Sequence, residues 1–357
     1  MGLGAQRPSA GSRGEGRGDG GAKGEDASDD DIAARAKLAK SAVEAGALGF
    51  STSRTLNHRT SDGQPTPTLT ASEQELTGIA MALGEAGKGV LQFVSDFDDP
   101  QKEAAMLRRI VERSGRPLSV SLAQADVAPE GWKHLLGEIE AAQAAGLDMR
   151  AQVGPRPVGL LLGLELTLNP FSGHPVYQTI AGDPFEARLA ALRDPAFREK
   201  LLSDEPDAEN PFVKSILRSF GKMFVLGDPP DYEPTADKTV AAIAQARGST
   251  PEAVALDLML ADDGRGMLYL PFLNYAQGSL DPVRTMLESP ASLPGLSDGG
   301  AHVGMICDGS FPTTLLTHWA RDRSRGEKLP LEFLIKRQSH VKPARVGLKD
   351  RGPLKPG

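Results

Sequence analysis

The sequence predicts an α/β protein whose core is a parallel β-sheet built from successive strand–helix units. The first observation is that strand-like and helix-like patterns alternate with a period of roughly 30 residues, as expected of a βα unit. The second is the composition, because 39% hydrophobic and 24% charged residues are typical of a soluble globular protein. The third is length, since 357 residues can bury a sizeable core.

The N-terminal segment differs in composition from the rest of the chain. Residues 1–31 are rich in Gly, Ser, Asp, Glu and Arg and have almost no large apolar side chains. Such a segment buries too little surface to offset the entropy lost on ordering, so we expect it to be disordered. A helix follows from Ile32, and Gly46 ends it before a strand at 48–51.

The middle of the chain repeats the same unit three times. Ser72 and Glu75 form a capping box that opens the first of these helices. Each unit has a helix with an apolar stripe and then a strand: 72–83 with 90–94, 106–111 with 118–122, and 132–139 with 147–153. The pattern predicts the units and leaves open whether the sheet closes on itself.

The segment 155–236 interrupts this alternation with Pro-rich and acidic stretches. It is too long for an ordinary loop, so we expect an insertion, after the strand near residue 150, that covers one end of the sheet. Helices and strands then resume near Thr239, with later strands at 267–273 and around Leu296. Two further helices are expected over 313–323 and 331–338. The total is about six βα units, whereas a (βα)₈ barrel has eight.

Charge and cysteine content exclude several classes of protein. A net charge of −7 argues against nucleic-acid binding, which requires clustered Lys and Arg. The single cysteine, Cys307, cannot form an internal disulfide, so the chain is compatible with a reducing compartment. No apolar run reaches the ~18 residues of a transmembrane helix, and the N-terminus lacks the apolar core of a signal peptide. We expect a cytoplasmic protein without nucleic-acid or membrane partners.

One segment combines an acid, a glycine pair and a histidine after an expected strand. It reads Gly-Leu-Ser-Asp-Gly-Gly-Ala-His over residues 295–302 and contains Asp298 and His302. A carboxylate at the end of a strand can take a proton from a metal-bound water and pass it to a leaving amine. Asp298 can equally cap the glycine turn, which is a common role of Asp. His302 is open to the same two interpretations, functional or structural.

Other polar residues follow expected strands. Ser53 belongs to a polar run at 51–59, and Arg156 follows the strand that ends at 153, where its planar fork suits a carboxylate. Both can equally be ordinary loop residues. The histidines show neither HxH nor HExxH spacing, so spacing alone predicts no zinc site. Cys307 has no CxxC partner, which favours a buried, unreactive role.

Several long motifs occur in an order that resembles a known family. The motifs are Gly-Ala-Leu-Gly-Phe-Ser-Thr-Ser-Arg at 46–54, Arg-Pro-Val-Gly-Leu at 156–160, Asp-Pro-Pro-Asp-Tyr-Glu-Pro at 228–234, and Ser-Asp-Gly-Gly-Ala-His at 297–302. They resemble the metal-dependent amidohydrolases of the D-aminoacylase (N-acyl-D-amino-acid deacylase) type. The resemblance implies a TIM-type barrel that carries zinc and hydrolyses N-acyl-D-amino acids or similar linear amides. It implies that Asp298 touches the metal site and shuttles the proton, and we expect His302, Arg156 and Ser53 to contact substrate.

The chain also departs from the family pattern. Family members begin with a small β domain and a first barrel strand with an HxH metal motif, followed by a cysteine ligand, and this sequence contains none of these. Where two further strands of the family each supply a histidine, this chain has Gln92 near Asp96 and Gln124 near Asp126. We therefore expect an N-terminally truncated member in which 32–357 form an incomplete barrel.

A barrel lacking strands has exposed edges, which favour self-association. We also expect weak metal binding and little activity of the chain alone. Two alternatives stay open, namely a catalytically dead barrel that serves as a binding module and an amidohydrolase acting on a cyclic amide or dipeptide.

Overall fold

The computed structural model describes residues 27–60, 64–203, 217–295, 304–306 and 309–348, together with Asp350 and Gly352. The first described helix, α1 (Asp29–Glu44), begins at a capping box. Ser28 Oγ accepts a hydrogen bond from the Asp31 backbone at 3.2 Å, and the Asp31 carboxylate accepts one from the Ser28 backbone at 3.1 Å. Of the segment expected to be disordered, residues 1–26 lie outside the described part, and the expectation is wrong for Asp29–Asp31, which form the capped first turn of α1.

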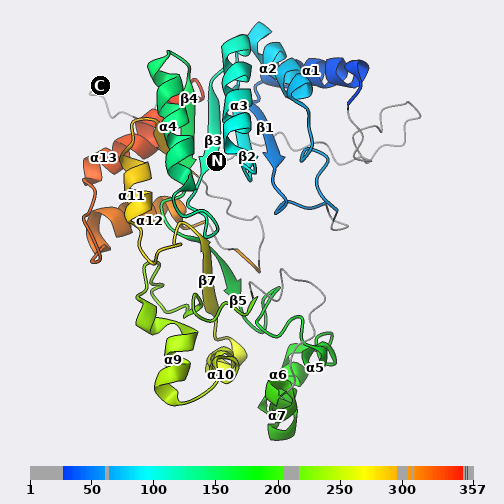
Figure 1. Ribbon diagram of the computed structural model, residues 1–357, viewed down its shortest axis with the longest axis vertical. Coiled ribbons are helices and arrows are strands. Elements are labelled where there is room, and N and C mark those ends of the chain that lie inside the picture. Colours follow the sequence, from blue (N-terminus) through cyan, green and yellow to red (C-terminus); the bar gives the residue numbers. More distant parts are fainter. Residues whose placement is uncertain are drawn as a thin grey trace.

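The main sheet is parallel and has the strand order β1-β2-β3-β4-β8. Its strands and the helices between them are β1 (Gly49–Arg54), α2 (Glu73–Glu85), β2 (Val90–Ser95), α3 (Pro100–Ser114), β3 (Leu118–Leu122), α4 (Gly131–Ala144), β4 (Met149–Val153) and β8 (Ser292–Pro294). Figure 1 shows α3 and α4 lying across one face of this sheet. The predicted α/β class with a parallel sheet is confirmed.

Apolar and polar side chains alternate along the strands, which explains why helices cover one face of the sheet. Leu91, Phe93, Leu118 and Val120 point to the helical side and are at most 1% exposed. They form a core with the stripes of α2, α3 and α4, which include the fully buried Leu83, Ile110 and Ile139. Burial of each such side chain stabilises the fold by roughly 1.5–3 kcal/mol.

The apolar strand expected at 267–273 forms as β7 (Leu268–Leu273), but it does not join the parallel sheet. It pairs antiparallel with β5 (Val158–Leu162) and β6 (Phe224–Val225) in a second sheet. The strands expected at 48–51, 90–94, 118–122 and 147–153 lie in the parallel sheet, and β8 lies just before Leu296, which is outside the described residues. Among the described strands that sheet is open, with β1 and β8 at its edges.

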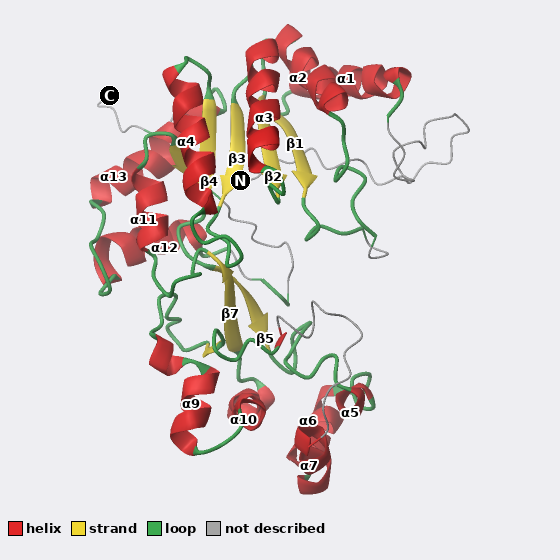
Figure 2. Cartoon of the chain, in the orientation of Figure 1, coloured by secondary structure: helices red, strands yellow, loops and turns green. Residues whose placement is uncertain are grey.

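Helices of the described segments lie beside the second sheet, as Figure 2 shows for the larger ones. They are α5 (Pro175–Gln178), α6 (Phe185–Arg193), α7 (Pro195–Ser203), η2 (Ala236–Lys238), α9 (Val240–Arg247) and α10 (Pro251–Gly264). Side chains from this sheet and these helices form a second core. Four of its side chains are 0% exposed, namely Leu162, Leu192, Met259 and Leu268. The segment 155–236, which was expected to form an insertion, contains the elements from β5 through β6.

The C-terminal helices return to the parallel sheet, beside β4 and β8. They are α11 (Asp281–Glu288), α12 (Phe311–Thr317), η3 (His318–Asp322), α13 (Leu331–Ile335), η4 (Lys336–Val341) and α14 (Lys342–Arg345). Trp319 is fully buried there, and its indole Nε1 donates to Pro155 O at 2.6 Å, which ties η3 to the loop after β4. In the described part of the chain, no helix has the length and apolar character needed to cross a membrane.

Candidate functional site

The strands of the parallel sheet all end at the same edge, and there the chain gathers polar side chains. In Figure 1 the strand arrowheads point toward β5 and β7, so the second sheet lies beyond this edge. Ser53 lies near the end of β1, and Arg156 lies three residues after β4. Asp298, His302 and Cys307 lie outside the described residues.

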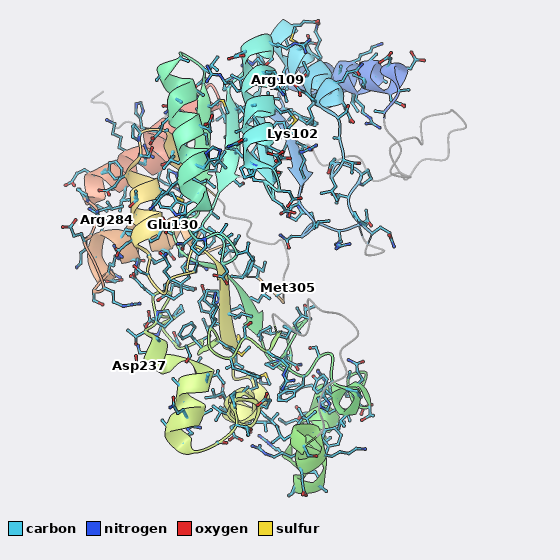
Figure 3. All side chains as sticks on the ribbon, viewed as in Figure 1. Lys102, Arg109, Glu130, Asp237, Arg284 and Met305 are labelled. Carbon is cyan, nitrogen blue, oxygen red and sulfur yellow. The ribbon has the colours of Figure 1, made fainter. Side chains whose placement is uncertain are left out.

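The chain on either side of the Asp298 motif is anchored to both sheets. Gly295 donates from its backbone to Val153 O at 2.8 Å, at the end of β4. A Cβ on Gly295 would come within 2.8 Å of the Cβ of Gln152, so this close approach requires glycine. On the other side, Met305 O accepts from the Leu161 backbone at 2.7 Å, and Figure 3 labels Met305 beside the second sheet.

Ser53 is hydrogen-bonded to a histidine of the loop that follows β1. Its Oγ lies 2.6 Å from Nδ1 of His58, and its carbonyl accepts from Thr68 Oγ1 at 2.6 Å. Asp96, after β2, fixes the same loop by accepting from the Leu56 backbone at 2.8 Å. The Ser53 hydroxyl and the His58 imidazole are therefore held together near the end of β1. The Asp96 carboxylate is bonded to the backbone of the loop that carries His58.

A ladder of neutral polar side chains crosses the face of the parallel sheet opposite the helices. Ser51 Oγ donates to Gln92 Oε1 at 2.6 Å, and Gln92 Nε2 donates to Ser121 Oγ at 3.4 Å. Farther across, Gln152 Nε2 donates to Ser119 Oγ at 2.9 Å. Gln92 therefore serves as a hydrogen-bonding link between three strands.

Gln124 joins the end of β3 to the end of β7. Its backbone N–H donates to Asn274 Oδ1 at 2.9 Å, and its carbonyl accepts from the Asn274 backbone at 2.8 Å. Its side chain accepts from the Ala276 backbone at 3.2 Å and donates to Pro129 O at 3.2 Å. Both Gln124 and Asn274 are 0% exposed, so these bonds are made away from water.

Arg156 is held between two aromatic rings. Its guanidinium carbon lies 4.2 Å from the centroid of Tyr232 and 4.3 Å from that of Phe311. The guanidinium also donates to Pro157 O at 3.0 Å and to Ser310 Oγ at 3.2 Å. With 2% exposure, the side chain has a fixed orientation at the end of β4.

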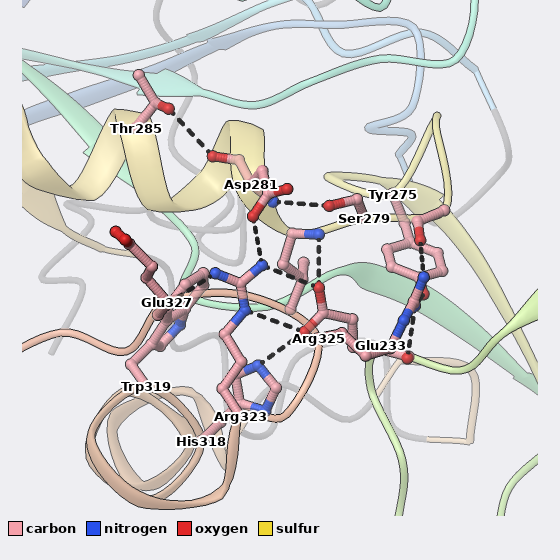
Figure 4. A network of polar contacts seen from close by, with 12 residues as sticks. Glu233, Tyr275, Ser279, Asp281, Thr285, His318, Trp319, Arg323, Arg325 and Glu327 are labelled. Atoms are coloured by element: carbon pink, nitrogen blue, oxygen red, sulfur yellow. Dashed lines mark hydrogen bonds and ion pairs between the residues drawn. The ribbon is translucent and has the colours of Figure 1, made fainter.

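The residue after Tyr232 is the centre of a buried ionic network (Figure 4). Oε1 and Oε2 of Glu233 each accept from Arg323 at 3.1 Å, and Oε1 also accepts from the Leu280 backbone at 3.0 Å. Nε2 of His318 lies 3.4 Å from Glu233 Oε2. Arg323 is 0% exposed at its side chain and reaches Asp281 as well, at 2.7 Å.

These contacts decide the ionisation of Glu233. Burial alone would raise the pKa of this carboxyl, but the contacts from His318, Arg323 and the Leu280 N–H together lower its pKa to about 2. Glu233 is therefore an anion at neutral pH. The network fixes the loop that places Tyr232 on Arg156.

A second arginine fixes the same loop through its backbone. Arg325 Nη1 donates to Glu233 O and to the phenolic oxygen of Tyr275, each at 2.8 Å, while the Tyr275 hydroxyl donates to Pro234 O at 2.6 Å. Burial raises the pKa of Tyr275 to about 12, with Arg325 acting in the opposite direction. Tyr275 is thus a neutral hydrogen-bonding group at neutral pH.

The family of the chain follows from comparison with known proteins. Residues 7–357 match the model of a family described as the amidohydrolase family. The chain belongs to the amidohydrolase family. The family assignment made from the sequence motifs is therefore confirmed. A search of curated proteins found no match.

Three D-aminoacylase structures are similar in fold to this amidohydrolase. One is a mutant in complex with copper chloride, with 19% identity and a TM-score of 0.52. Another concerns the functional role of the binuclear metal centre of D-aminoacylase, with 20% identity and a TM-score of 0.52. The third, with 20% identity and a TM-score of 0.50, describes D-aminoacylase as defining a novel subset of amidohydrolases. Each match covers 93% of this chain and 56% of the other, so the chain spans little more than half the length of these proteins.

The described residues of this amidohydrolase do not fit a metal centre. No three His, Cys, Asp or Glu side chains within the described ranges are grouped closely enough to hold an ion. Gln124 makes hydrogen bonds with both atoms of its amide, and Asp126 pairs with Lys222 Nζ at 2.6 Å. Gln92, within β2, and Gln124, just after β3, thus have neutral amides in structural hydrogen bonds.

Sequence reasoning placed some of these residues and missed others. Arg156 follows β4 as expected, whereas Ser53, expected after a strand that ends at residue 51, lies within β1, which extends to Arg54; β2 and β3 lie between the two residues. Since strands are spaced by about 4.8 Å, the two residues lie three such spacings apart. Glu233 and Asn274 were not singled out for a role. The Asp-Tyr-Glu stretch at 231–233 carried a signal only through its resemblance to the family.

Proposed function

We propose that this amidohydrolase hydrolyses the linear amide bond of N-acyl-D-amino acids or similar N-acyl compounds. The observation that carries the proposal is the family match over residues 7–357, and the fold similarity to D-aminoacylases supports it. Polar side chains at the C-terminal edge of the parallel strands occupy the place where α/β barrels carry their active sites. The substrate class is taken from the fold relatives and is part of the proposal.

Within this proposal, Arg156 binds the substrate carboxylate. Its support is the fixed, planar guanidinium at the end of β4, presented between Tyr232 and Phe311. We assign Asp298 to proton transfer, and Ser53 and His302 to substrate contacts, on the strength of the sequence motifs. A carboxylate in the role of Asp298 gives the leaving nitrogen the proton that it needs to depart as an amine.

Zinc is the metal that we propose for the reaction, with Asp298 as its ligand in this chain. A bound metal would supply Lewis-acid polarisation of the acyl carbonyl. Because the described residues do not form a metal centre, the proposal needs further ligands from outside the described residues. We therefore propose that the chain alone binds metal weakly and turns over slowly.

A second function has a specific observation in its favour. Gln92 and Gln124 are neutral amides already bonded to Ser51, Ser121 and Asn274, so they offer no ligand to a metal, and a small acid would be bound at this edge without chemistry. In that case the chain is a binding module. It binds the N-acyl amino acid and releases no product.

The decisive experiment measures hydrolysis and binding on the same samples. The chain is incubated with the N-acetyl derivative of an apolar D-amino acid, its L enantiomer, a hydantoin and a dipeptide, each with and without added Zn²⁺. We expect slow, zinc-stimulated release of amine from the D compound, ahead of the other three. Faster cleavage of the hydantoin or dipeptide would overturn the proposed substrate class. Calorimetric binding of the D compound without any release would favour the binding module.

A further inference from the structure

A serine and a histidine are in contact at an open edge of the parallel sheet. Ser53 lies on β1, which has no partner on its outer side among the described strands (Figure 1). Its Oγ lies 2.6 Å from Nδ1 of His58. Both side chains are half-buried, and Asn57 and Arg59, on either side of His58, are exposed, so the loop lies at the surface. In the amide hydrolysis proposed above, His58 has no role.

Backbone hydrogen bonds hold the imidazole in place. The His58 N–H donates to Thr55 O at 3.4 Å, which closes a turn, and the Asn57 N–H donates to Thr55 Oγ1 at 3.1 Å. Asp96 fixes the same turn from β2, because its carboxylate accepts from the Leu56 N–H at 2.8 Å. Each residue from Thr55 to His58 is thus bonded, so the imidazole is oriented before any ligand arrives. Asp96 acts through this turn and is a positioning residue.

The backbone N–H of Ser53 points to the same open edge. Across the β1–β2 pair, the Asp96 N–H donates to Arg54 O at 3.2 Å, so Arg54 faces β2. Successive residues of a strand direct their backbone groups to opposite sides, which turns Ser53 away from β2. Its carbonyl accordingly accepts from Thr68 Oγ1 at 2.6 Å, outside the sheet. The N–H of Ser53 lies on this side too, where a backbone donor can stabilise an oxyanion.

A neighbouring serine on the same strand lacks such a base. Ser51 lies two residues before Ser53 and so on the same face of β1, and its Oγ donates to Gln92 Oε1 at 2.6 Å. An amide oxygen accepts a hydrogen bond but does not take up a proton near neutral pH, whereas a neutral imidazole does. The two hydroxyls have hydrogen bonds of equal length, and only that of Ser53 is bonded to a group able to remove its proton.

We propose that Ser53 and His58 form a catalytic dyad that hydrolyses carboxylic esters without a metal. With the imidazole proton on Nε2, Nδ1 takes the proton of Ser53 Oγ while this oxygen bonds to the acyl carbon of the ester. The bond from that carbon to the alkoxy oxygen breaks, and the alkoxy oxygen takes the proton from Nδ1 and leaves as an alcohol. Water then adds to the acyl carbon and gives a proton to Nδ1. Ser53 Oγ recovers this proton as the carboxylic acid is released.

The test uses the whole chain and p-nitrophenyl acetate in the presence of a metal chelator, so that zinc-dependent amide hydrolysis does not contribute. We expect release of p-nitrophenol that Ser53→Ala and His58→Gln each slow by at least about tenfold. Glutamine at position 58 can still accept a hydrogen bond but cannot act as the base. Mass spectrometry of acid-quenched wild-type chain should find the acetyl group on Ser53, a result that does not depend on any variant being folded.

The matched control is Ser51→Ala, which removes a hydroxyl from the same face of β1 and should leave both the rate and the acetylation of Ser53 unchanged. Absence of p-nitrophenol release would overturn the proposal, as would an equal loss of rate in Ser51→Ala or acetyl groups found only on lysines or on His58. Circular dichroism of each variant confirms that it is folded. Amide hydrolysis with added Zn²⁺ is measured separately, so the failure of either activity is distinguishable from that of the other.

Discussion

Asn274 and Gln124 exchange two hydrogen bonds, and through them the second sheet is fastened to the end of the parallel sheet. Asn274 has a φ of 65°, a left-handed conformation that asparagine adopts more readily than most residues. Its Nδ2 also reaches Gly154 O at 3.4 Å, beside the loop that carries Arg156. One side chain thus connects the ends of β3, β4 and β7.

Two replacements of Asn274 separate the contribution of its side-chain hydrogen bonds from that of its left-handed backbone conformation. We expect Asn274→Ala to lower the free energy of unfolding by about 2–3 kcal/mol, because Gln124 N–H loses its acceptor and alanine is strained at this φ. Asn274→Gly keeps the φ and loses only the side-chain bonds, so it should cost about 1 kcal/mol less. Urea denaturation measures both. Equal costs for the two variants would mean that the backbone conformation contributes nothing.

The buried network around Glu233 predicts a large effect of a neutral replacement. Glu233→Gln leaves Arg323, which is 0% exposed, without its bidentate partner, so we expect a loss of about 3 kcal/mol in unfolding free energy. The control is Glu327→Gln, whose carboxylate is 83% exposed and pairs with Arg284 at 3.0 Å. It should cost less than about 1 kcal/mol. Similar losses in the two variants would contradict the special role of the buried pair.

The same carboxyl predicts how stability depends on pH. The pKa of Glu233 is about 2 in the folded chain against an ordinary 4.5, so its contribution is present above pH 4.5 and is lost as the pH falls toward 2. The gap in unfolding free energy between wild type and Glu233→Gln should shrink by about 2 kcal/mol from pH 5 to pH 3. Denaturant titrations at several pH values measure the gap. A gap that is constant over this range would exclude a depressed pKa.

The position of Arg156 between two aromatic rings predicts that a lysine there would not stabilise the chain as well as the arginine does. The ammonium of lysine is compact and strongly hydrated, and it cannot fill the slot between Tyr232 and Phe311 as a flat guanidinium does. We expect Arg156→Lys to destabilise the chain by about 1–2 kcal/mol, read from the thermal midpoint. Arg265→Lys, at a side chain 60% exposed, should leave the midpoint unchanged. An unchanged midpoint for Arg156→Lys as well would show that stacking is unimportant.

Local patterns predicted most of the elements but not all of their partners. The units from β1 to β4 could be predicted because each helix stripe and strand alternation is contained in a short window. The sequence of β7 is a nearly continuous apolar run from Leu268 to Leu273, and such a run fits a parallel or an antiparallel neighbour equally well. Its pairing with β5 depends on contacts made more than 100 residues apart in sequence, between residues such as Leu160 and Leu270.

The candidate site was predictable to the extent that it depends on strand ends. Arg156 could be placed there because it follows an apolar strand, whereas β1 extends through the first part of the polar run to Arg54, so Ser53 lies within the strand and not after it. The pairing of Glu233 with Arg323 spans 90 positions, and neither residue carries a local pattern that indicates the other. A buried ion pair of this kind looks in sequence like two ordinary surface charges.

The bond from Trp319 to Pro155 gives the chain an optical reporter. The sequence has only two tryptophans, and the other, Trp132, lies on α4. In a Trp132→Phe variant, fluorescence would come from a single indole that is bonded to the residue adjoining Arg156. Emission wavelength and quenching would then follow the loop after β4 directly, in solution and without an attached dye.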